Sequence, residues 1–169
     1  IGTSGIGGAL ARQLSSSGHE LHLIGRNSEK VAALATELGA THSIADAMDA
    51  AALEQAVQAA GPVIDGLAYC VGSINLKPAH RTSDADALKD FELNALGALR
   101  AARAALPALK ASTSATASVV LFSTVAVGQG FASHASVAMA KGAVEGLTRT
   151  LAAEWSPKIR VNAIAPSLT

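Results

Sequence analysis

Apolar residues recur along the chain in two patterns, one typical of short strands and the other typical of amphipathic helices. Short, mainly apolar runs predict strands over residues 21–24, 42–45, 65–70, 119–122 and 159–164. Apolar positions spaced three or four residues apart predict helices over residues 7–17, 28–39, 50–59, 84–110 and 133–155. Ser28 is placed to cap the second helix, and Gly128 and Gly130 predict a loop.

The order of these elements indicates the fold class. Strands and helices alternate along the whole chain, which is typical of an α/β protein with a parallel sheet and right-handed crossovers. The run 119–122 is uninterrupted and apolar, so we expect it to be a buried strand.

A glycine cluster precedes the first predicted helix directly. Glycine has no Cβ, so the backbone can turn tightly and approach an anion closely. The helix that follows presents free N–H groups and the positive end of its dipole to the same place. We therefore expect a phosphate-binding loop formed by Gly2, Thr3, Ser4, Gly5, Ile6 and Gly7.

Composition and charge narrow the class of protein further. Hydrophobic residues make up 50% of the 169 residues, enough for a sizeable core. Lys and Arg together number 13, as do Asp and Glu, so the chain lacks the basic excess that nucleic acid or an acidic membrane surface attracts. The single Cys70 is typical of a reducing compartment, no run is long and apolar enough for a membrane span, and no metal-ligand spacing occurs. We expect a cytoplasmic protein without a metal site.

Several motifs together resemble the short-chain dehydrogenase/reductase family over essentially the whole chain. They lie at residues 4–11, 65–72, 91–94, 119–124, 141–148 and 159–166. The resemblance implies a Rossmann fold: a doubly wound parallel sheet in a three-layer α/β/α arrangement, with residues 1–169 forming one dinucleotide-binding domain. Because a strand normally precedes the glycine loop, we expect the chain to be a fragment that lacks the first strand and the C-terminal part.

The resemblance implies an NAD(P)-dependent oxidoreductase that acts on alcohols or ketones. The choice of coenzyme rests on Arg26, because a guanidinium suits the 2′-phosphate of NADP and no acidic residue stands there to bind the 2′-hydroxyl of NAD. The alternative interpretation of Arg26 is an ordinary surface arginine. We expect Asp46 to frame the adenine, and the alternative is that it caps a helix. The remaining expected coenzyme contacts are Asn27, Ala47, Cys70, Val71, Gly72, Lys141, Pro166 and Ser167.

The family's catalytic Tyr-x-x-x-Lys motif reads Val137 to Lys141 here, so the usual proton donor is absent. In one interpretation Lys141 holds the nicotinamide ribose while His134, on the same helical face, handles the proton, although a helix-capping or solvent-facing role is more common for such a histidine. In a second, Thr124 or the adjacent Ser123 orients the carbonyl, and water or Lys141 relays the proton. In a third, the protein binds NADP without turnover. Asn94 is expected to organise a proton-relay water within its helix.

The two longest predicted helices also point to assembly. Their alanine-rich faces exceed what one sheet face should cover, and related proteins pair these helices across a two-fold axis. We expect a homodimer or homotetramer acting on a small carbonyl or alcohol substrate. The alanines concerned are Ala95, Ala98, Ala101 and Ala102 on one helix and Ala138, Ala143, Ala152 and Ala153 on the other.

Overall fold

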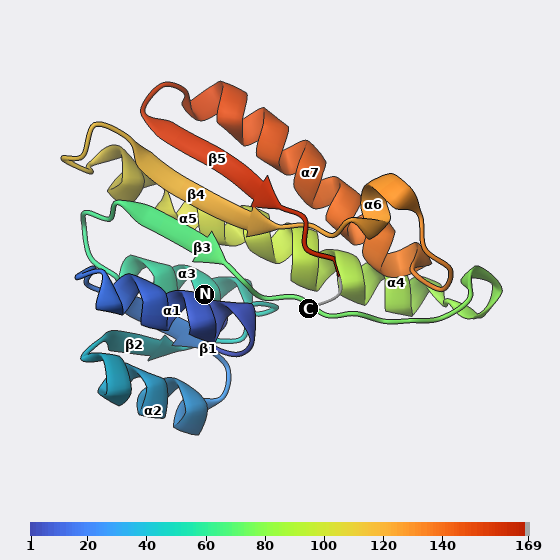
Figure 1. The fold of residues 1–169 in the computed structure, drawn as a ribbon, viewed down its shortest axis with the longest axis horizontal. Helices are drawn as coiled ribbons and strands as arrows, with labels where there is room; N and C mark the ends of the chain where they lie inside the picture. The colour runs from blue at the N-terminus through green and yellow to red at the C-terminus, as the bar shows by residue number, and fades with distance from the viewer. Residues whose placement is uncertain (168–169) are drawn as a thin grey trace.

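The computed structural model describes residues 1–167 and shows parallel strands with helices on both faces (Figure 1). Two parallel sheets are present, one with the order β1-β2 and the other with the order β3-β4-β5. In the larger sheet, Val119 of β4 pairs with Leu67 on one side and Val161 on the other. The strands are β1 His22–Gly25, β2 Thr41–Ile44, β3 Gly66–Tyr69, β4 Ala117–Phe122 and β5 Ile159–Ile164.

The two sheets are joined by the first two residues of the chain, where the sequence predicts one continuous sheet. The N atom of Ile1 donates to the carbonyl of Ala68, and the carbonyl of Ile1 accepts from the amide of Cys70, both at 2.8 Å. On the other side, the amide of Gly2 donates to the carbonyl of Ile24 at 2.8 Å. The glycine loop therefore begins between β1 and β3, at the carboxyl ends of both strands.

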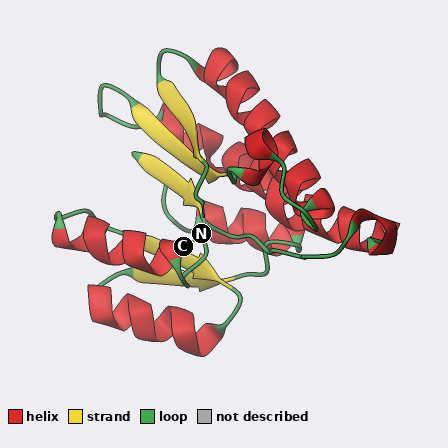
Figure 2. Cartoon of the chain, turned by 45° about the vertical axis from the view of Figure 1, so that its right-hand side comes forward, coloured by secondary structure: helices red, strands yellow, loops and turns green. Residues whose placement is uncertain are grey.

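Helices cover both faces of the strands, so the fold is Rossmann-like, as predicted (Figure 2). Helices α1 and α2 pack together on one face, whereas α3 packs on α5, and α5 and α7 pack on the larger sheet, on the other. None of the helices in residues 1–167 has the length and apolar character needed to span a membrane. The α-helices are α1 Ile6–Ser16, α2 Ser28–Leu38, α3 Ala50–Gln58, α4 Asp84–Phe91, α5 Gly97–Lys110, α6 Ala126–Gln129 and α7 Ala135–Trp155, and a 3₁₀ turn covers Ala79–Arg81.

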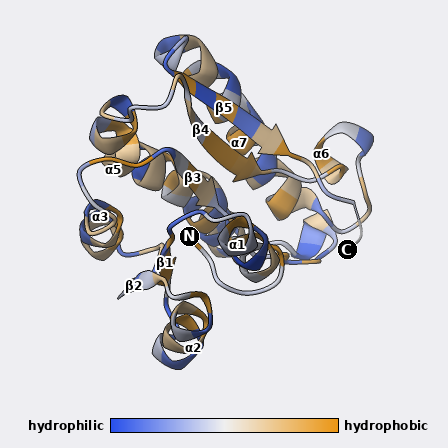
Figure 3. Ribbon diagram, turned by 60° about the vertical axis from the view of Figure 1, so that its left-hand side comes forward, coloured by the Kyte–Doolittle hydropathy of each residue, from blue (hydrophilic) through white to orange (hydrophobic). Residues whose placement is uncertain are grey.

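The core lies between the larger sheet and helices α3, α5 and α7. Figure 3 shows the hydrophobic colour along β4, the central strand of that sheet. Val119 and Leu121 of β4 are fully buried, but their neighbours Val120 and Phe122 are only half-buried. The predicted burial of this strand is therefore complete on one face and partial on the other. There, Val120 and Phe122 line a hollow beside α1.

The predicted helix over residues 84–110 is interrupted. A π-helical segment, Glu92–Leu96, separates α4 from α5. Such wide turns occur frequently at functional sites, and this one contains Asn94. Two further expectations are corrected: Asn27, not Ser28, caps α2, and the loop predicted around Gly128 contains the short helix α6.

The alanines expected to form a dimer face on α5 and the preceding π segment are buried within the chain itself. Ala98, Ala101 and Ala102 are 0% exposed and Ala95 is 5% exposed, all in the main hydrophobic core. Small side chains here let α5 lie close to β3, β4 and α3. On α7, Ala138, Ala143 and Ala152 are half-buried and Ala153 is exposed. The α5 alanines therefore serve intramolecular packing, and any interface must use other residues.

Candidate functional site

The glycine loop between Ile1 and α1 follows a path that requires glycine. Gly2 and Gly5 have φ values of 90° and 53°, in the region that side chains with a Cβ rarely adopt. A Cβ on Gly7 would overlap the carbonyl oxygen of Gly2, so α1 approaches the start of the loop more closely than any other residue type allows. A Cβ on Gly2 would lie 3.0 Å from the carbonyl carbon of Cys70, which closes the loop against the end of β3.

The loop leaves donors free where an anion would rest. Gly5 occupies the N-cap of α1, and no side chain in the described part of the chain caps this helix. Within residues 1–167, the amides of Gly5 and Ile6 have no hydrogen-bond acceptor. Among the described residues, no atom would lie within 4 Å of a Cβ placed on Gly5, so the loop is open at this position. Free amides at a helix N-terminus fit a pyrophosphate.

A second group of residues converges beside this loop, around Gly72. A Cβ on Gly72 would lie 2.9 Å from Oδ1 of Asn94 and 3.2 Å from Nζ of Lys141. Gly72 follows β3, Asn94 belongs to the π segment and Lys141 lies on α7, so three elements meet here. The structure therefore brings together three of the residues that the sequence singled out.

Lys141 is held in a nearly closed environment. Its side chain is 8% exposed, and Nζ donates to the carbonyl of Phe122 at 2.8 Å. Burial disfavours the charged ammonium and lowers the pKa of Lys141 to about 8, although the nearby Cys70 thiol opposes this effect. The same burial raises the pKa of the Cys70 thiol. At neutral pH, Lys141 therefore carries a proton that it gives up more readily than an ordinary lysine.

Asn94 has an unpaired buried oxygen that faces this lysine region. Nδ2 of Asn94 donates to the carbonyl of Asp90 at 2.8 Å, while Oδ1 has no partner within the described residues. An orphaned buried acceptor is costly unless a water or ligand completes it. The hydroxyl of Tyr69 donates to the carbonyl of Leu93 at 2.7 Å and so supports the π segment that carries Asn94.

The two candidate hydroxyls at the end of β4 differ in their partners. The hydroxyl of Ser123 donates to Oε1 of Glu145 at 2.6 Å, and Ser123 is only 4% exposed. The hydroxyl oxygen of Thr124 accepts from the amide of Ala126 at 3.3 Å, and within residues 1–167 its own O–H has no acceptor. Thr124 is therefore the better placed of the two to bind a substrate oxygen.

His134 lies outside the helix that was expected to carry it. It is the N-cap residue of α7, with φ −106° and ψ 17°, and its ring Nδ1 pairs with the carbonyl of Ala132 at 2.8 Å. The ring also packs edge-on against Phe131, with centroids 5.5 Å apart. Val137 lies in α7 and is 2% exposed, so the position four residues before Lys141 is buried and apolar.

The residues expected to contact the adenosine half lie at the ends of β1 and β2. Arg26 is exposed and forms no ion pair within residues 1–167, whereas the side chain of Asn27 accepts from the amide of Lys30 as the cap of α2. Asp46 accepts from the amide of Met48 at 3.0 Å, and Asp49, not Asp46, caps α3. Ala47 is buried in the main core, and Val71 packs against that core.

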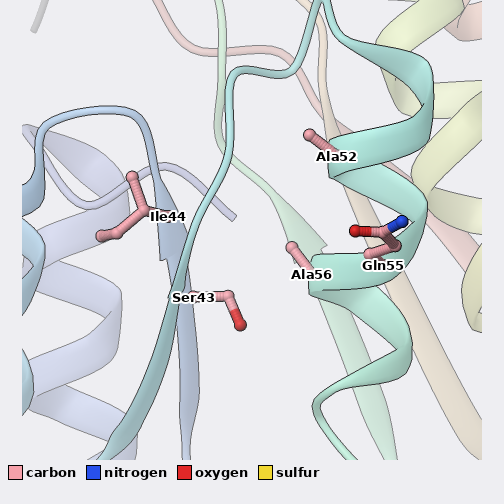
Figure 4. Close-up of a pocket in the computed structure, with 5 residues that line it drawn as sticks. All are labelled: Ser43, Ile44, Ala52, Gln55 and Ala56. Atoms are coloured by element: carbon pink, nitrogen blue, oxygen red, sulfur yellow. The ribbon is translucent and has the colours of Figure 1, made fainter.

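Two hollows lie between the strands and helices described above. An apolar one of about 430 Å³ brings Ile6 of the glycine loop to Pro166, two expected coenzyme contacts that are far apart in sequence. Ser167 follows Pro166 and is exposed. The other hollow, of about 290 Å³, lies between Ser43 of β2 and Ala52 and Ala56 of α3 (Figure 4). It contains no predicted site residue and no charged side chain, and we assign it no role. The described residues contain no cluster of three metal-ligating side chains.

Sequence reasoning missed a polar cluster that adjoins the Gly72 group. Asp90 is 4% exposed, and its carboxylate accepts from the hydroxyls of Ser73 at 2.9 Å and Ser136 at 2.6 Å. The available signal was an acidic residue one helical turn before Asn94, on the buried side of an amphipathic helix. No spacing rule connects it to the two serines, which come from other segments.

Comparisons with known proteins agree with the fold and the motifs. A family model described as enoyl-(acyl carrier protein) reductase matches residues 1–169. The chain is 38% identical over 172 residues to galactitol 2-dehydrogenase (L-tagatose-forming) of Cereibacter sphaeroides, covering 96% of this chain and 66% of that protein. It is 31% identical to the 3-oxoacyl-[acyl-carrier-protein] reductase of Rattus norvegicus, covering 98% and 71% respectively.

A solved structure from Brucella melitensis, described as a short-chain dehydrogenase/reductase SDR:Glucose/ribitol dehydrogenase, superposes with a TM-score of 0.90. It is 32% identical in sequence, and the match covers 98% of this chain and 72% of that one. The chain therefore spans about two thirds to three quarters of these proteins, and 66%, just under two thirds, of the galactitol dehydrogenase.

Proposed function

Because the chain belongs to the short-chain dehydrogenase/reductase family, we propose that it binds NADP(H) and transfers hydride between that coenzyme and a secondary alcohol or ketone. The observation that carries the proposal is the meeting of Gly72, Asn94 and Lys141 beside a glycine loop with free amides. One relative is named for a polyol and another for a 3-oxoacyl group, so an oxygenated carbon chain is the substrate class that both names share.

The amides of Gly5 and Ile6 would hold the pyrophosphate, and Lys141 would hold the nicotinamide ribose. When bound, NADPH supplies the hydride to the carbonyl carbon. The carbonyl oxygen then takes a proton, which gives a secondary alcohol and NADP⁺. Val137 has no proton to give, and the hydroxyl of Tyr69, the only tyrosine, is committed to the Leu93 carbonyl. The proton must come from another group.

We assign the proton to Lys141, passed through a water on Oδ1 of Asn94, with Thr124 orienting the carbonyl. The lowered pKa of Lys141 supports this role, because a donor works best near the operating pH. The pairing of His134 with Ala132 favours a positioning role for that ring. The proposal extends to a cytoplasmic location, which the single Cys70 supports.

A protein that binds NADP without turnover is the second candidate, and the buried, apolar Val137 favours it. Val137→Tyr separates the two. The change places a phenol four residues before Lys141, whose ammonium would lower the phenol's pKa. We expect NADPH-dependent reduction in a panel of ketones to rise by about ten-fold or more.

Two outcomes divide the candidates. If the natural protein binds NADPH but reduces no ketone and Val137→Tyr creates activity, the silent function is correct. If the natural protein is active, His134→Ala should leave its turnover within about two-fold, and a loss of about a hundred-fold would make His134 the donor. NADPH binding by fluorescence checks that each variant is folded.

Arg26→Gln tests the choice of coenzyme. The exposed guanidinium would face the 2′-phosphate, so we expect the Kd for NADPH to rise about ten-fold or more, while the Kd for NADH changes by less than about two-fold. Isothermal calorimetry measures both. Arg103→Gln, an equally exposed arginine on α5, is the control and should change neither affinity. Equal effects on NADPH and NADH would contradict the assignment of NADP.

We also propose a homodimer or homotetramer through α4 and α7. These helices pack together and carry the exposed apolar side chains of Leu88, Phe91 and Met139, which are 67%, 44% and 68% exposed. Exposed large apolar residues on adjoining helices are typical of a subunit interface.

A further inference from the structure

The buried Asp90 joins three segments that surround the proposed nicotinamide end of the site. Its carboxylate accepts from Ser73, in the loop after β3, and from Ser136, in the first turn of α7. Its main-chain carbonyl accepts from Nδ2 of Asn94 at 2.8 Å. The loop, α7 and the π segment are therefore tied to a single residue.

This carboxylate has an unusual set of partners for a buried charge. Burying a carboxylate is costly unless hydrogen bonds or a cation compensate it. Within residues 1–167 it forms no ion pair, and its partners are two serine hydroxyls. Hydrogen bonds to an ionised acceptor are short and directional, so moving either serine would leave the buried charge without one of its two hydrogen-bond donors. Both serine positions are therefore firmly held.

Both serines adjoin residues of the site. Ser73 follows Gly72, whose Cα already lies so close to Asn94 and Lys141 that a Cβ would collide with Oδ1 of Asn94. Ser136 directly precedes Val137, and Val137 stands four residues before Lys141. A shift of about one ångström at either serine would change the space in which Asn94 and Lys141 meet.

We infer that Asp90 is a positioning residue, which fixes Gly72 and Val137 through the serines next to them and so shapes the pocket for the nicotinamide end of the coenzyme. The link to the coenzyme rests on the proposed function, whereas the link between the three segments does not. The alternative is a purely structural role, in which loss of Asp90 weakens the whole fold evenly.

The test compares two ligands in the intact protein. NADPH reaches both ends of the site, and adenosine 2′,5′-bisphosphate represents only its adenosine half. Asp90→Ala should raise the Kd for NADPH about ten-fold, because two hydroxyls lose their acceptor, but should change the Kd for the bisphosphate by less than about two-fold. Asp90→Asn retains an acceptor oxygen and should recover part of the affinity for NADPH.

The chain offers a control with the same kind of hydrogen-bond partners at the opposite end of β3, at the exposed Asp65. The carboxylate of Asp65 also accepts from two serine hydroxyls, Ser112 at 2.5 Å and Ser114 at 2.9 Å. It precedes β3, whereas the Gly72 group follows that strand. Asp65→Ala should leave both affinities unchanged. Equal weakening of both ligands by Asp90→Ala would overturn the inference.

A second measurement decides the inference without any ligand. Amide hydrogen exchange in Asp90→Ala should quicken about ten-fold or more at residues 71–76 and 134–138, but not elsewhere in the core. Uniform acceleration, or none, would overturn it. If the natural protein binds neither ligand, the proposed function fails while exchange still decides the role of Asp90. If Asp90→Ala does not fold, the smaller changes Ser73→Ala and Ser136→Ala should show the same local pattern.

Discussion

Gly7→Ala is expected to weaken NADPH binding about a hundred-fold or more and to lower the stability of the protein. The added Cβ would overlap the Gly2 carbonyl oxygen, and no side-chain rotation can relieve a backbone overlap. Either α1 or the glycine loop must move. We expect the free energy of unfolding to fall by about 1–3 kcal/mol, the usual cost of overpacking a tight site.

The effect on binding follows from the same displacement. Two charge-assisted hydrogen bonds from the amides of Gly5 and Ile6 would be lost, each worth about 1.5–3 kcal/mol. The Kd for NADPH should therefore rise about a hundred-fold or more. Calorimetric titration measures the affinity and urea unfolding measures the stability. Unchanged NADPH affinity in Gly7→Ala would show that the pyrophosphate does not rest on this loop.

Gly146→Ala is the matched control. Gly146 lies inside α7, and a Cβ there would meet no atom of residues 1–167 within 4 Å. Alanine restricts the unfolded chain more than glycine does, so this change should stabilise the protein by about 0.5–1 kcal/mol without altering binding. If Gly7→Ala destabilises the protein and Gly146→Ala stabilises it, the effect at Gly7 comes from the close backbone contact and not from the helix propensity of alanine.

Much of the fold follows from local sequence patterns, because burial repeats with the period of each element. The run 159–164 is observed as a strand with the predicted bounds, and the other four strands lie within two residues of their predicted positions. The π segment was not predicted, since residues 84–110 have a helical pattern throughout and the wide turn depends on tertiary contacts. Tyr69 donates to Leu93, and its hydroxyl lies where a Cβ on Gly97 would be.

The residues of the candidate site likewise fall into those that motifs predict and those that only the tertiary structure reveals. Lys141, Asn94 and Gly72 were predicted from motifs, and the structure brings them together, although their roles remain proposals. The cluster around Asp90 was not predictable, because its two serines are 17 and 46 residues away along the chain. The roles of Ser123 and Thr124 were likewise indistinguishable until Glu145 was seen to accept from Ser123.

The site also contains features that reduce stability. A buried lysine with a lowered pKa and an unpaired amide oxygen both cost folding free energy, and both adjoin Gly72. Proteins retain such features where catalysis or binding needs them. This argument predicts that removing the lysine should impair function and improve stability at the same time.

Lys141→Met should lower NADPH-dependent turnover about a hundred-fold or more, because it removes the proposed proton donor and ribose contact. The same change should raise the free energy of unfolding at pH 7. The pKa of Lys141 is about 8 in the folded protein against about 10.5 for an exposed lysine in the unfolded chain, so at pH 7 the buried charge costs about 3 kcal/mol. Loss of the hydrogen bond to Phe122 offsets about 1 kcal/mol of that gain.

The pH dependence of the stability difference between the natural protein and Lys141→Met tests whether the buried charge is the cause. Below pH 8, Lys141 is charged in both the folded and the unfolded states, and the full cost applies. Between pH 8 and 10.5 the folded protein has released the proton that the unfolded chain still holds, so the stability of the natural protein rises relative to that of Lys141→Met. Lys110→Met, at an exposed position at the end of α5, should show a stability difference from the natural protein that does not vary over this pH range.

Turnover in the direction of ketone reduction should fall as the pH rises through about 8, because the donor loses its proton. Urea unfolding and initial rates from pH 6 to 10 measure both effects, and a stability difference that stays constant across pH 8 to 10 would contradict the buried charge.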